Sequence, residues 1–458
     1  PGVTLRPHQE MCRLRSCATG DAGDILQVGR RPDPLDAETG GSMLESELKL
    51  GVAQQDLEKV LKLPCVRGAL SSTPRRRLLK NSYYDTPEFD LRKNGVELRV
   101  RHAGREWIQT IKVPHGGLIG LHLRIEIDSP VKGDSPDLTA LSCTEVPPMV
   151  DSPLVSGRIE KLFETRYWRR RAMLELPDGS LIELNVDSGG AHAGEESLPI
   201  SEIELELKRG GVGALYEMAE LIADGIDARV QSLKKPDLGY RILQNHRPEA
   251  VFAKPTELQP GQTAEEVFVA LLTESLEHAF ANEEAILAGS DIEGVHQMRV
   301  GLRRFRSCLS VFKRSMRIRP DQSAENFIKP LLNALGPARD WDVFLGEGFA
   351  RIERAMAGHR ELSAIRKIAN NLRKRVYDNL RRLLRSREFH RAKLALVSWI
   401  ARRAWRNSMS PGESKKLTEP TNDYMKRILR RGDRCVRRQG REIQKRSAKE
   451  LHRLRITV

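Results

Sequence analysis

The chain has 458 residues, of which 39% are hydrophobic and 30% charged, and its 77 Lys and Arg exceed its 62 Asp and Glu by a net charge of +15. This length can supply two or three hydrophobic cores, so no disulfide staples are needed and the six cysteines are expected to be free thiols in a reducing cytosol. No apolar run reaches the roughly 18 residues of a membrane span and no secretory signal pattern occurs, which excludes a membrane-spanning helix. We therefore expect a cytoplasmic protein and no membrane partner.

The positive charge is concentrated towards the C-terminal end of the chain. Residues 351–458 hold 32 Lys and Arg against 10 Asp and Glu, whereas residues 1–250 hold 34 against 38. Such a concentration indicates a polyanionic partner, which could be a nucleic acid, a phosphate polymer or an acidic membrane. Solvated helix faces would give the same composition, so charge alone does not choose among these interpretations.

The first half of the chain has the pattern of a sheet. Residues 1–42 show no sustained period, and we expect them to be a disordered extension outside the fold. Helical spacing occurs at 53–62 and 212–227. From residue 43 onward hydrophobic and polar residues alternate, which predicts strands at 43–50, 95–102, 106–113, 122–128, 164–175, 180–187 and 200–208.

These strands carry charged residues on one face only. In the first strand Leu44, Leu48 and Leu50 share one face. One such strand is usually a half-buried strand with a wet outer face, but here the pattern repeats. The charged rows are Glu45, Glu47 and Lys49; Glu97, Arg99 and Arg101; Thr110 and Lys112; Arg124, Glu126 and Asp128; Thr165, Tyr167, Arg169 and Arg171; Glu183, Asn185 and Asp187; Glu202, Glu204, Glu206 and Lys208.

Rows of like charge on neighbouring strands repel one another unless counter-ions lie between them. Clustered carboxylates suit Mg²⁺ or Mn²⁺, and clustered Arg and Lys suit phosphate oxygens. A closed barrel with a charged interior would hold both, with its apolar faces packed outward against helices.

A set of short motifs follows one another between residues 43 and 245. They are Glu45-Ser46-Glu47-Leu48-Lys49, Tyr83-Tyr84-Asp85-Thr86, Leu98-Arg99-Val100-Arg101, Trp107-Ile108-Gln109-Thr110-Ile111-Lys112, Arg124-Ile125-Glu126, Glu202-Ile203-Glu204-Leu205-Glu206, and Lys235 before Gly239-Tyr240. The ExExK element alone is a weak signal. The ordered set resembles the CYTH superfamily, also called triphosphate tunnel metalloenzymes.

This resemblance implies an eight-stranded antiparallel tunnel over residues 43–245 and metal-dependent hydrolysis of inorganic triphosphate. It implies catalytic roles for Glu45, Glu47 and Lys49. Leu238 stands where bacterial members often have Arg, which puts one peripheral contact in doubt. The implied ligands of Mg²⁺ or Mn²⁺ are Glu45, Glu47, Glu202 and Glu204, with Glu126 as a further ligand or as a residue that orients one. The implied substrate-binding residues are Lys49, Arg99, Arg101, Lys112, Arg124, Arg169 and Lys235.

Nothing in the local spacing suggests a nucleophilic pair. His102, His115, His122 and His192 are expected near turns or on apolar faces, in structural roles. The Gly-rich stretches lack a Gly-Lys-Ser/Thr ending, which excludes a P-loop enzyme. Other activities of the superfamily stay open, namely adenylate cyclase, thiamine triphosphatase and mRNA-capping triphosphatase.

The second half of the chain has helical spacing. Residues 246–262 are expected to be a linker because they are polar and rich in proline, and the region 263–458 is expected to be all-helical. Val295, Met298, Leu302, Phe305, Leu309 and Phe312 share one helix face. His296, Arg299, Arg303 and Arg306 share the adjoining face, which would line a binding groove or form a solvated edge.

A short repeat points to a second family. Val295-His296-Gln297-Met298-Arg299-Val300 recurs as Leu451-His452-Arg453-Leu454-Arg455-Ile456, 156 residues later. These stretches, together with Leu335-Gly336-Pro337-Ala338-Arg339-Asp340-Trp341-Asp342-Val343, resemble the CHAD domain, so the expected fold class is α+β. The second copy stops at Val458, so we expect a C-terminally truncated second repeat that is unstable or depends on oligomerisation.

The resemblance to CHAD implies helical bundles around a basic pore that binds inorganic polyphosphate. The implied binding residues are His296, Arg299, Arg303, Arg306, His452 and Arg455, and polyphosphate granules are the expected cellular association. Two alternatives from other classes stay open: a polyphosphate-binding protein without catalysis, and a nucleic-acid-binding protein. The aromatic content of 5% counts against single-strand binding, so no specific nucleic acid is expected.

Overall fold

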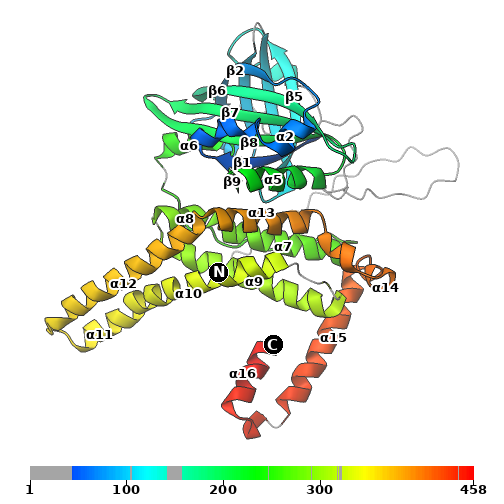
Figure 1. Ribbon diagram of the computed structural model, residues 1–458. Coiled ribbons are helices and arrows are strands. Elements are labelled where there is room, and N and C mark those ends of the chain that lie inside the picture. Colours follow the sequence, from blue (N-terminus) through cyan, green and yellow to red (C-terminus); the bar gives the residue numbers. More distant parts are fainter. Residues whose placement is uncertain are drawn as a thin grey trace, which may run out of the picture. The chain divides into compact units, whose positions relative to one another are not determined.

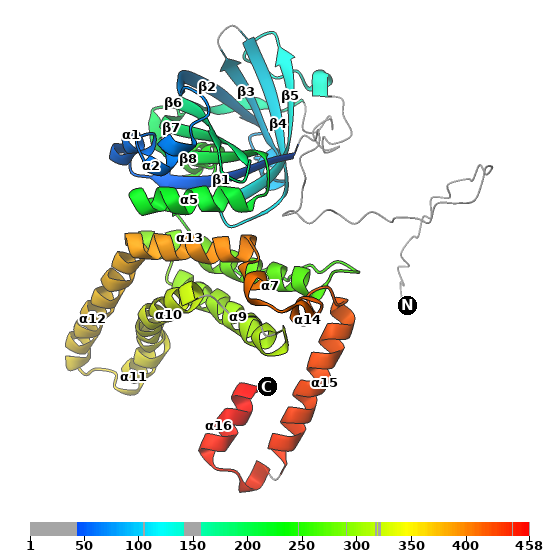
Figure 2. The same ribbon diagram turned by 45° about the vertical axis from the view of Figure 1, so that its right-hand side comes forward.

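The computed structural model describes residues 44–103, 106–141, 157–245, 247–289, 291–316, 318, 322–441 and 443–457. Within these residues the chain is of the α+β class, with a β-barrel followed by helices, as predicted (Figures 1 and 2). The extension at residues 1–42 lies outside the described residues, so the prediction made for it is not tested. Among the described helices none has both the length and the hydrophobicity that crossing a bilayer requires.

The barrel is a closed ring of antiparallel strands. Its strand order is β5-β4-β3-β2-β6-β7-β8-β1, and β1 pairs with β5 to close the ring, while β9 adds to β1. This confirms the predicted eight-stranded antiparallel barrel. The strands are β1 (Leu44–Val52), β2 (Arg75–Asp85), β3 (Glu97–Ala103), β4 (Glu106–Leu118), β5 (Leu121–Val131), β6 (Glu160–Glu175), β7 (Leu181–Ala193), β8 (Glu196–Arg209) and β9 (Ala228–Val230).

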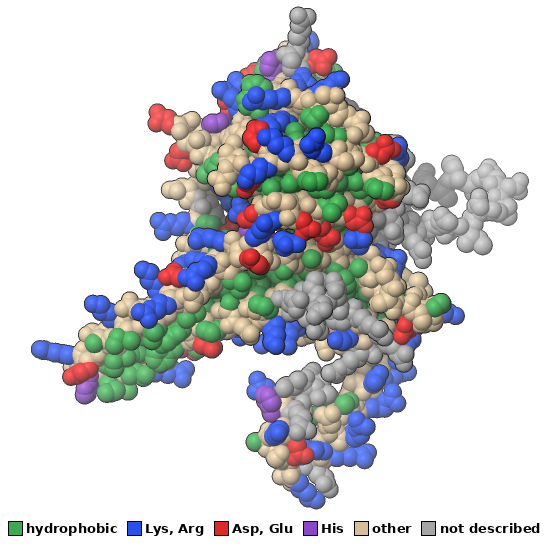
Figure 3. Space-filling view, in the orientation of Figure 1, with side chains coloured by type: hydrophobic (Ala, Val, Ile, Leu, Met, Phe, Trp, Pro, Cys, Tyr) green, Lys and Arg blue, Asp and Glu red, His purple; other side chains and the backbone are tan. Residues whose placement is uncertain are grey.

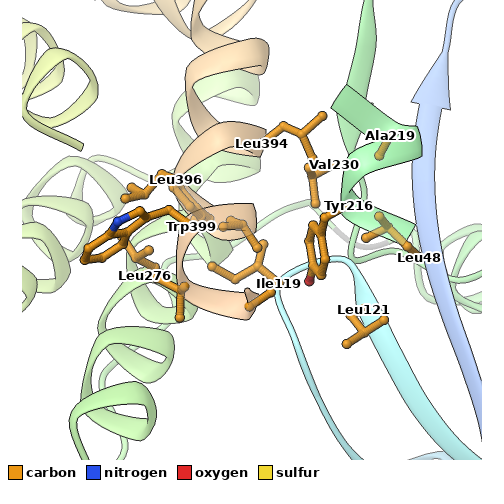
Figure 4. Packing of buried hydrophobic residues seen from close by; sticks show 14 of the residues in the cluster. Leu48, Ile119, Leu121, Tyr216, Ala219, Val230, Leu276, Leu394, Leu396 and Trp399 are labelled. Atoms are coloured by element: carbon orange, nitrogen blue, oxygen red, sulfur yellow. The ribbon is translucent and has the colours of Figure 1, made fainter. Parts of the chain in front are cut away.

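The outer face of the barrel is apolar because alternate residues of each strand point outward. Leu48 of β1 and Leu121 of β5 pack outward against Tyr216 and Ala219 of one helix, α5 (Figure 4). Each such leucine stabilises the fold by roughly 1.5–3 kcal/mol relative to an exposed one. The barrel's helices are α1 (Leu57–Val60), α2 (Pro64–Ala69), α3 (Asp90–Lys93), α5 (Gly213–Gly225) and α6 (Lys235–Gln244).

Helix α6 fills one end of the barrel. The buried rings of Tyr83, Phe163 and Tyr240 cluster there with Ala193, and the Tyr240 hydroxyl donates a hydrogen bond to Asp85 Oδ2 at 2.8 Å. Gly239 is required at this contact, because a Cβ on it would lie 2.1 Å from Phe163 Cδ2.

Leu238, the departure from the family pattern, lies beside the small buried cluster of Leu79, Tyr167 and Ile200 at this end of the barrel. The substitution therefore replaces a possible charge with an apolar contact.

The second half is helical, as predicted. The stripe from Val295 to Phe312 is buried along α9, and the side chains of Leu276, Leu396 and Trp399 pack in the same core (Figure 4). No helix or strand occurs in the described residues 247–262. The helices are α7 (Ala264–Ala281), α8 (Glu283–Ala288), α9 (Glu293–Met316), α10 (Gln322–Val343), α11 (Phe349–Ala355), α12 (Glu361–Leu384), α13 (Arg387–Ala401), α14 (Pro411–Ser414), α15 (Thr421–Gly440) and α16 (Ala448–Thr457).

The later helices expose both hydrophobic and basic side chains. Hydrophobic side chains gather on the pair α11 and α12, where Ile365 is 47% and Ile368 60% exposed, and Lys and Arg dominate α15 and α16 (Figure 3). Leu429 of α15 is 70% exposed. These helices therefore present hydrophobic and basic side chains at the surface, whereas the barrel also buries charged side chains in its interior.

Candidate active site

The charged rows of the strands meet inside the barrel. Lys49 Nζ lies 3.0 Å from Glu47 Oε1 and 3.6 Å from Glu202 Oε1, and it also pairs with Glu204. Lys235, at the start of α6, shares two of these carboxylates, since it pairs with Glu202 and its Nζ lies 2.6 Å from Glu204 Oε1. The charged faces that alternation in the sequence predicted for separate strands thus line the same barrel interior.

Three carboxylates from two neighbouring strands form a group that can hold a metal ion. One oxygen from each of Asp187, Glu202 and Glu204 lies within 4.8 Å of the others, and all three side chains are buried. Asp187 of β7 and Glu202 of β8 are direct cross-strand partners, which places them on the same face. Asp187 was not among the predicted ligands, although the alternating row Glu183, Asn185 and Asp187 was the signal that contained it.

Two predicted ligands belong to a second group. Lys112 Nζ lies 2.7 Å from Glu45 Oε2 and 2.7 Å from Glu126 Oε2, and Arg99 Nη2 lies 3.1 Å from Glu126 Oε1. Glu45 and Glu126 are therefore held together through the Lys112 ammonium, apart from the three-carboxylate group.

Glu47 lies between the two groups. It accepts a hydrogen bond from Arg124, while its Oε1 is buried and accepts none. Burial and the negative charge of Glu204 raise the pKa of Glu47 to about 7, although Lys49 and Arg124 act to lower it. Glu47 therefore pairs with two cations, with Arg124 through Oε2 and with Lys49 Nζ at 3.0 Å from Oε1.

The cations of the interior are held in the charged state by these carboxylates. Burial acts against Lys49, but Glu204, Glu47 and Glu202 raise its pKa above the ordinary value. Arg169 donates to Asp187 Oδ1 at 2.9 Å through Nε and also pairs with Glu204. The predicted phosphate-binding residues on the strands thus meet carboxylates here.

Arg101 is held differently from the other interior cations. Its Nε donates to Asn81 Oδ1 at 2.9 Å, and Asn81 Nδ2 donates in turn to Thr165 Oγ1 at 3.0 Å. Burial, Arg99 and Arg169 lower the pKa of Arg101. A neutral amide, and not a carboxylate, therefore positions this guanidinium.

His122 lies next to the turn that precedes β5, as expected, and its structural role stays a prediction. The residue lies on the interior face of β5 with Arg124 and Glu126, opposite Glu47. Its Nε2 is buried without a hydrogen bond, and burial together with Arg124 and Lys49 lowers its pKa well below the ordinary value. His122 is thus a neutral interior side chain, and its place in the β5 alternation could have revealed it. By contrast, His102 stacks on Trp107 of the outer face, as expected for a structural histidine, with ring centroids 4.4 Å apart.

The predicted residues of the helical half lie on two helices. His296, Arg299, Arg303 and Arg306 lie along α9, beside its buried stripe, with partly or fully exposed side chains. His452 and Arg455 are exposed on α16, which contacts α15. The structure therefore places the two copies of the repeat on two separate helices, α9 and α16.

Comparison with known proteins finds relatives for the barrel and for most of the chain. The inorganic triphosphatase of Haemophilus influenzae is 32% identical over 200 residues, which are 43% of this chain and 54% of that protein, so the chain spans about half the length of this relative. An uncharacterized protein of Mycobacterium tuberculosis is 26% identical over 399 residues, covering 84% of this chain and 75% of that protein.

Among solved structures, the CHAD domain from the plant Ricinus communis is 26% identical, over 45% of this chain and 66% of that chain, with a TM-score of 0.38. Residues 43–225 match the CYTH domain family, and residues 270–458 match the CHAD domain family. The chain therefore carries a CYTH domain followed by a CHAD domain, and the charged interior described above belongs to the CYTH domain.

Proposed function

We propose that the CYTH barrel hydrolyses inorganic triphosphate to diphosphate and phosphate with Mg²⁺ or Mn²⁺. The observation that carries the proposal is the meeting of carboxylates and cations in one buried interior, where Lys49 and Lys235 share the carboxylate of Glu204. The name of the Haemophilus influenzae relative supports the choice of substrate. Adenylate cyclase and thiamine triphosphatase activities are the alternatives within the superfamily.

The residues present fit a hard divalent cation. Asp187, Glu202 and Glu204 offer carboxylate oxygens, the ligands that Mg²⁺ and Mn²⁺ prefer, and Glu47 Oε1 is buried without a hydrogen bond. When bound, such a cation would neutralise charge on the phosphate oxygens. Because these carboxylates now pair with Lys49, Lys235 and Arg169, loading the site would exchange ion pairs within the protein for bonds to the incoming ions.

The chain's own residues supply the rest of the chemistry. Phosphoryl transfer requires positioning and charge stabilisation more than covalent catalysis. Lys49, Lys235 and Arg169 would bind phosphate oxygens at the three-carboxylate group, and Arg99, Arg124 and Lys112 would bind them at the second. Oxygens of Glu47 and Glu45 would orient the attacking water by accepting its hydrogen bonds.

The experiment is a substrate comparison with the full chain. Phosphate release would be measured from tripolyphosphate, ATP and thiamine triphosphate, each with Mg²⁺, with Mn²⁺ and with EDTA. The proposal expects the highest kcat/KM with tripolyphosphate and loss of turnover in EDTA. Equal turnover with and without EDTA would contradict the role of the carboxylates, and a preference for ATP or thiamine triphosphate would replace the substrate.

The CHAD helices suggest a second function, the binding of inorganic polyphosphate. Support comes from the 32 Lys and Arg of residues 351–458 and from the exposed side chains of Arg303 and Arg306 on α9. The test is retention of the full chain on immobilised long-chain polyphosphate. Elution by polyphosphate but not by an equal charge of single-stranded DNA would support it, and the reverse would contradict it.

A further inference from the structure

Six arginines face one another where β2 meets β6. The register pairs Arg75 with Arg171, Arg76 with Arg170 and Arg77 with Arg169. Like charges placed directly opposite on two strands destabilise a sheet. Three such pairs in succession call for anions that neutralise them.

The arginines of β6 have such anions within the protein. Arg169 Nη2 lies 2.6 Å from Asp187 Oδ2, and Arg171 Nη2 lies 2.5 Å from Glu183 Oε2. Arg170 Nη1 donates to Glu58 Oε2 at 2.8 Å. Each guanidinium of this strand is therefore matched by a carboxylate.

The arginines of β2 are not matched in this way. All three are exposed, and in the described residues no hydrogen bond or ion pair joins Arg75 or Arg77 to another side chain. Arg76 stacks on Trp168, with its guanidinium carbon 4.0 Å from the ring centroid. Two cations of this strand are thus free to bind an external anion.

The register decides where these cations point. Cross-strand partners share a face, so Arg77 shares the face of Arg169, whose guanidinium reaches Glu204 in the interior. Arg75 is two residues from Arg77 and therefore lies on the same face of β2, whereas Arg76 points outward.

These residues also lie at the end of the barrel that α6 leaves free. Strand β2 runs from Arg75 to Asp85, and its other end carries Tyr83, which packs with Tyr240 of α6. We call the end marked by Arg75 and Arg77 the open end.

We propose that Arg75 and Arg77 form an anion subsite at the open end, where a linear condensed phosphate binds as it enters the barrel. The proposal rests on the function proposed above. Guanidinium groups bind phosphate oxygens in pairs of hydrogen bonds, and Arg77 continues inward through Arg169 to Lys235. A row of cations leading into a site raises the rate of association with a polyanion by about 10-fold to 1,000-fold.

The strand provides its own matched control. The double variant Arg75→Gln/Arg77→Gln removes the two interior-facing charges, and Arg76→Gln removes a charge that is also exposed but lies on the outer face. We expect the double variant to raise KM for tripolyphosphate about tenfold, to leave kcat within about twofold, and to weaken the dependence of kcat/KM on salt between about 20 and 200 mM. Arg76→Gln should behave as the parent.

Two outcomes would overturn the subsite. One is a double variant whose KM and salt dependence equal those of the parent. The other is an Arg76→Gln variant with half or more of the effect of the double variant, which would show that net charge and not position matters. Because the double variant removes repulsion between strands, its thermal unfolding midpoint should not fall. A lower midpoint would reveal misfolding as the cause of a raised KM.

Binding measurements separate this proposal from the function on which it rests. Tripolyphosphate binding would be titrated calorimetrically on the full chain carrying Glu47→Gln, with and without the double variant. If the double variant weakens tripolyphosphate binding but the parent chain does not hydrolyse tripolyphosphate, the subsite is supported and the hydrolase is rejected. Unchanged binding of tripolyphosphate, with loss of binding to single-stranded DNA instead, would reject the subsite and assign the arginines to nucleic acid.

Discussion

The barrel and the last helices both carry many cations, but they balance them differently. Inside the barrel Lys49 and Lys235 are buried and touch carboxylates from neighbouring strands. On α15 the side chains of Arg437 and Asp433 form a pair that is 78% and 56% exposed. Buried charges need fixed partners, whereas exposed charges are neutralised by water and salt. The first arrangement favours a defined ligand geometry, and the second favours binding of polyanions of many shapes.

The largest expected effect tests the interior as a site of chemistry. Glu47→Gln keeps the shape of the side chain but removes the negative charge at the centre of the site. We expect tripolyphosphate turnover to fall by at least about 100-fold, since the loss of one charge-stabilising group typically costs this much. Phosphate release measures the activity, and far-UV circular dichroism checks the fold. A variant that hydrolyses as well as the parent would show that the interior is not the active site.

A second prediction compares stability in the two regions. Glu204→Ala leaves Lys49, Lys235 and Arg169 without their shared carboxylate, and breaking a buried ion pair typically costs about 3–5 kcal/mol. Asp433→Ala on α15 breaks an exposed pair, whose contribution is about 0.5 kcal/mol or less.

Urea unfolding at neutral pH measures both variants. Added tripolyphosphate should recover part of the loss in Glu204→Ala, because its oxygens can replace the missing carboxylate. Equal losses of unfolding free energy in the two variants would remove the distinction between buried and exposed charge.

A third prediction concerns pH. Burial of Glu126 acts to raise its pKa, but the charges of Lys112 and Arg99 outweigh burial and lower the pKa from 4.5 to about 2. A carboxyl whose pKa is lowered by folding stabilises the protein above its unfolded pKa, and this stabilisation is lost as pH falls towards the folded pKa. The difference in unfolding free energy between the parent and Glu126→Gln should thus be about 1–3 kcal/mol at pH 7 and shrink between about pH 5 and pH 2.

This comparison is made by urea unfolding in metal-free buffer. A difference that stays constant down to pH 2 would mean that Glu126 acts through packing and not through charge.

The smallest expected effect lies in the helical half. Arg303→Gln/Arg306→Gln should weaken binding to long-chain polyphosphate about threefold to tenfold in low salt, and by less in high salt, because exposed charges are screened. Tripolyphosphate turnover should not change. Fluorescence polarisation with labelled polyphosphate at two salt concentrations measures the effect. A parallel fall in turnover would show that the two regions do not act separately.

The sequence predicted the parts of the fold that follow a local period. Strands such as β1 and β8 alternate cleanly, and the buried stripe of α9 repeats every three or four residues, so both were found. Strand β2 was missed because Arg75, Arg76 and Arg77 are charged on both faces, which hides the alternation. Helix α6 was missed because it is short and contains Pro236 and Gly239.

The site was predicted as a set of residues but not as an arrangement. Alternation gives the face of each side chain, so the residues that meet inside the barrel could be named in advance. The partners of each residue depend on strand register, which the period of one strand does not contain. For this reason Asp187 was not grouped with Glu202 and Glu204.

The contact between Gly239 and Phe163 has a consequence for turnover. Helix α6, seated against that ring, covers the end of the barrel opposite Arg75 and Arg77. A triphosphate that enters past these arginines would meet diphosphate leaving by the same end, so we expect diphosphate to compete with tripolyphosphate for the interior.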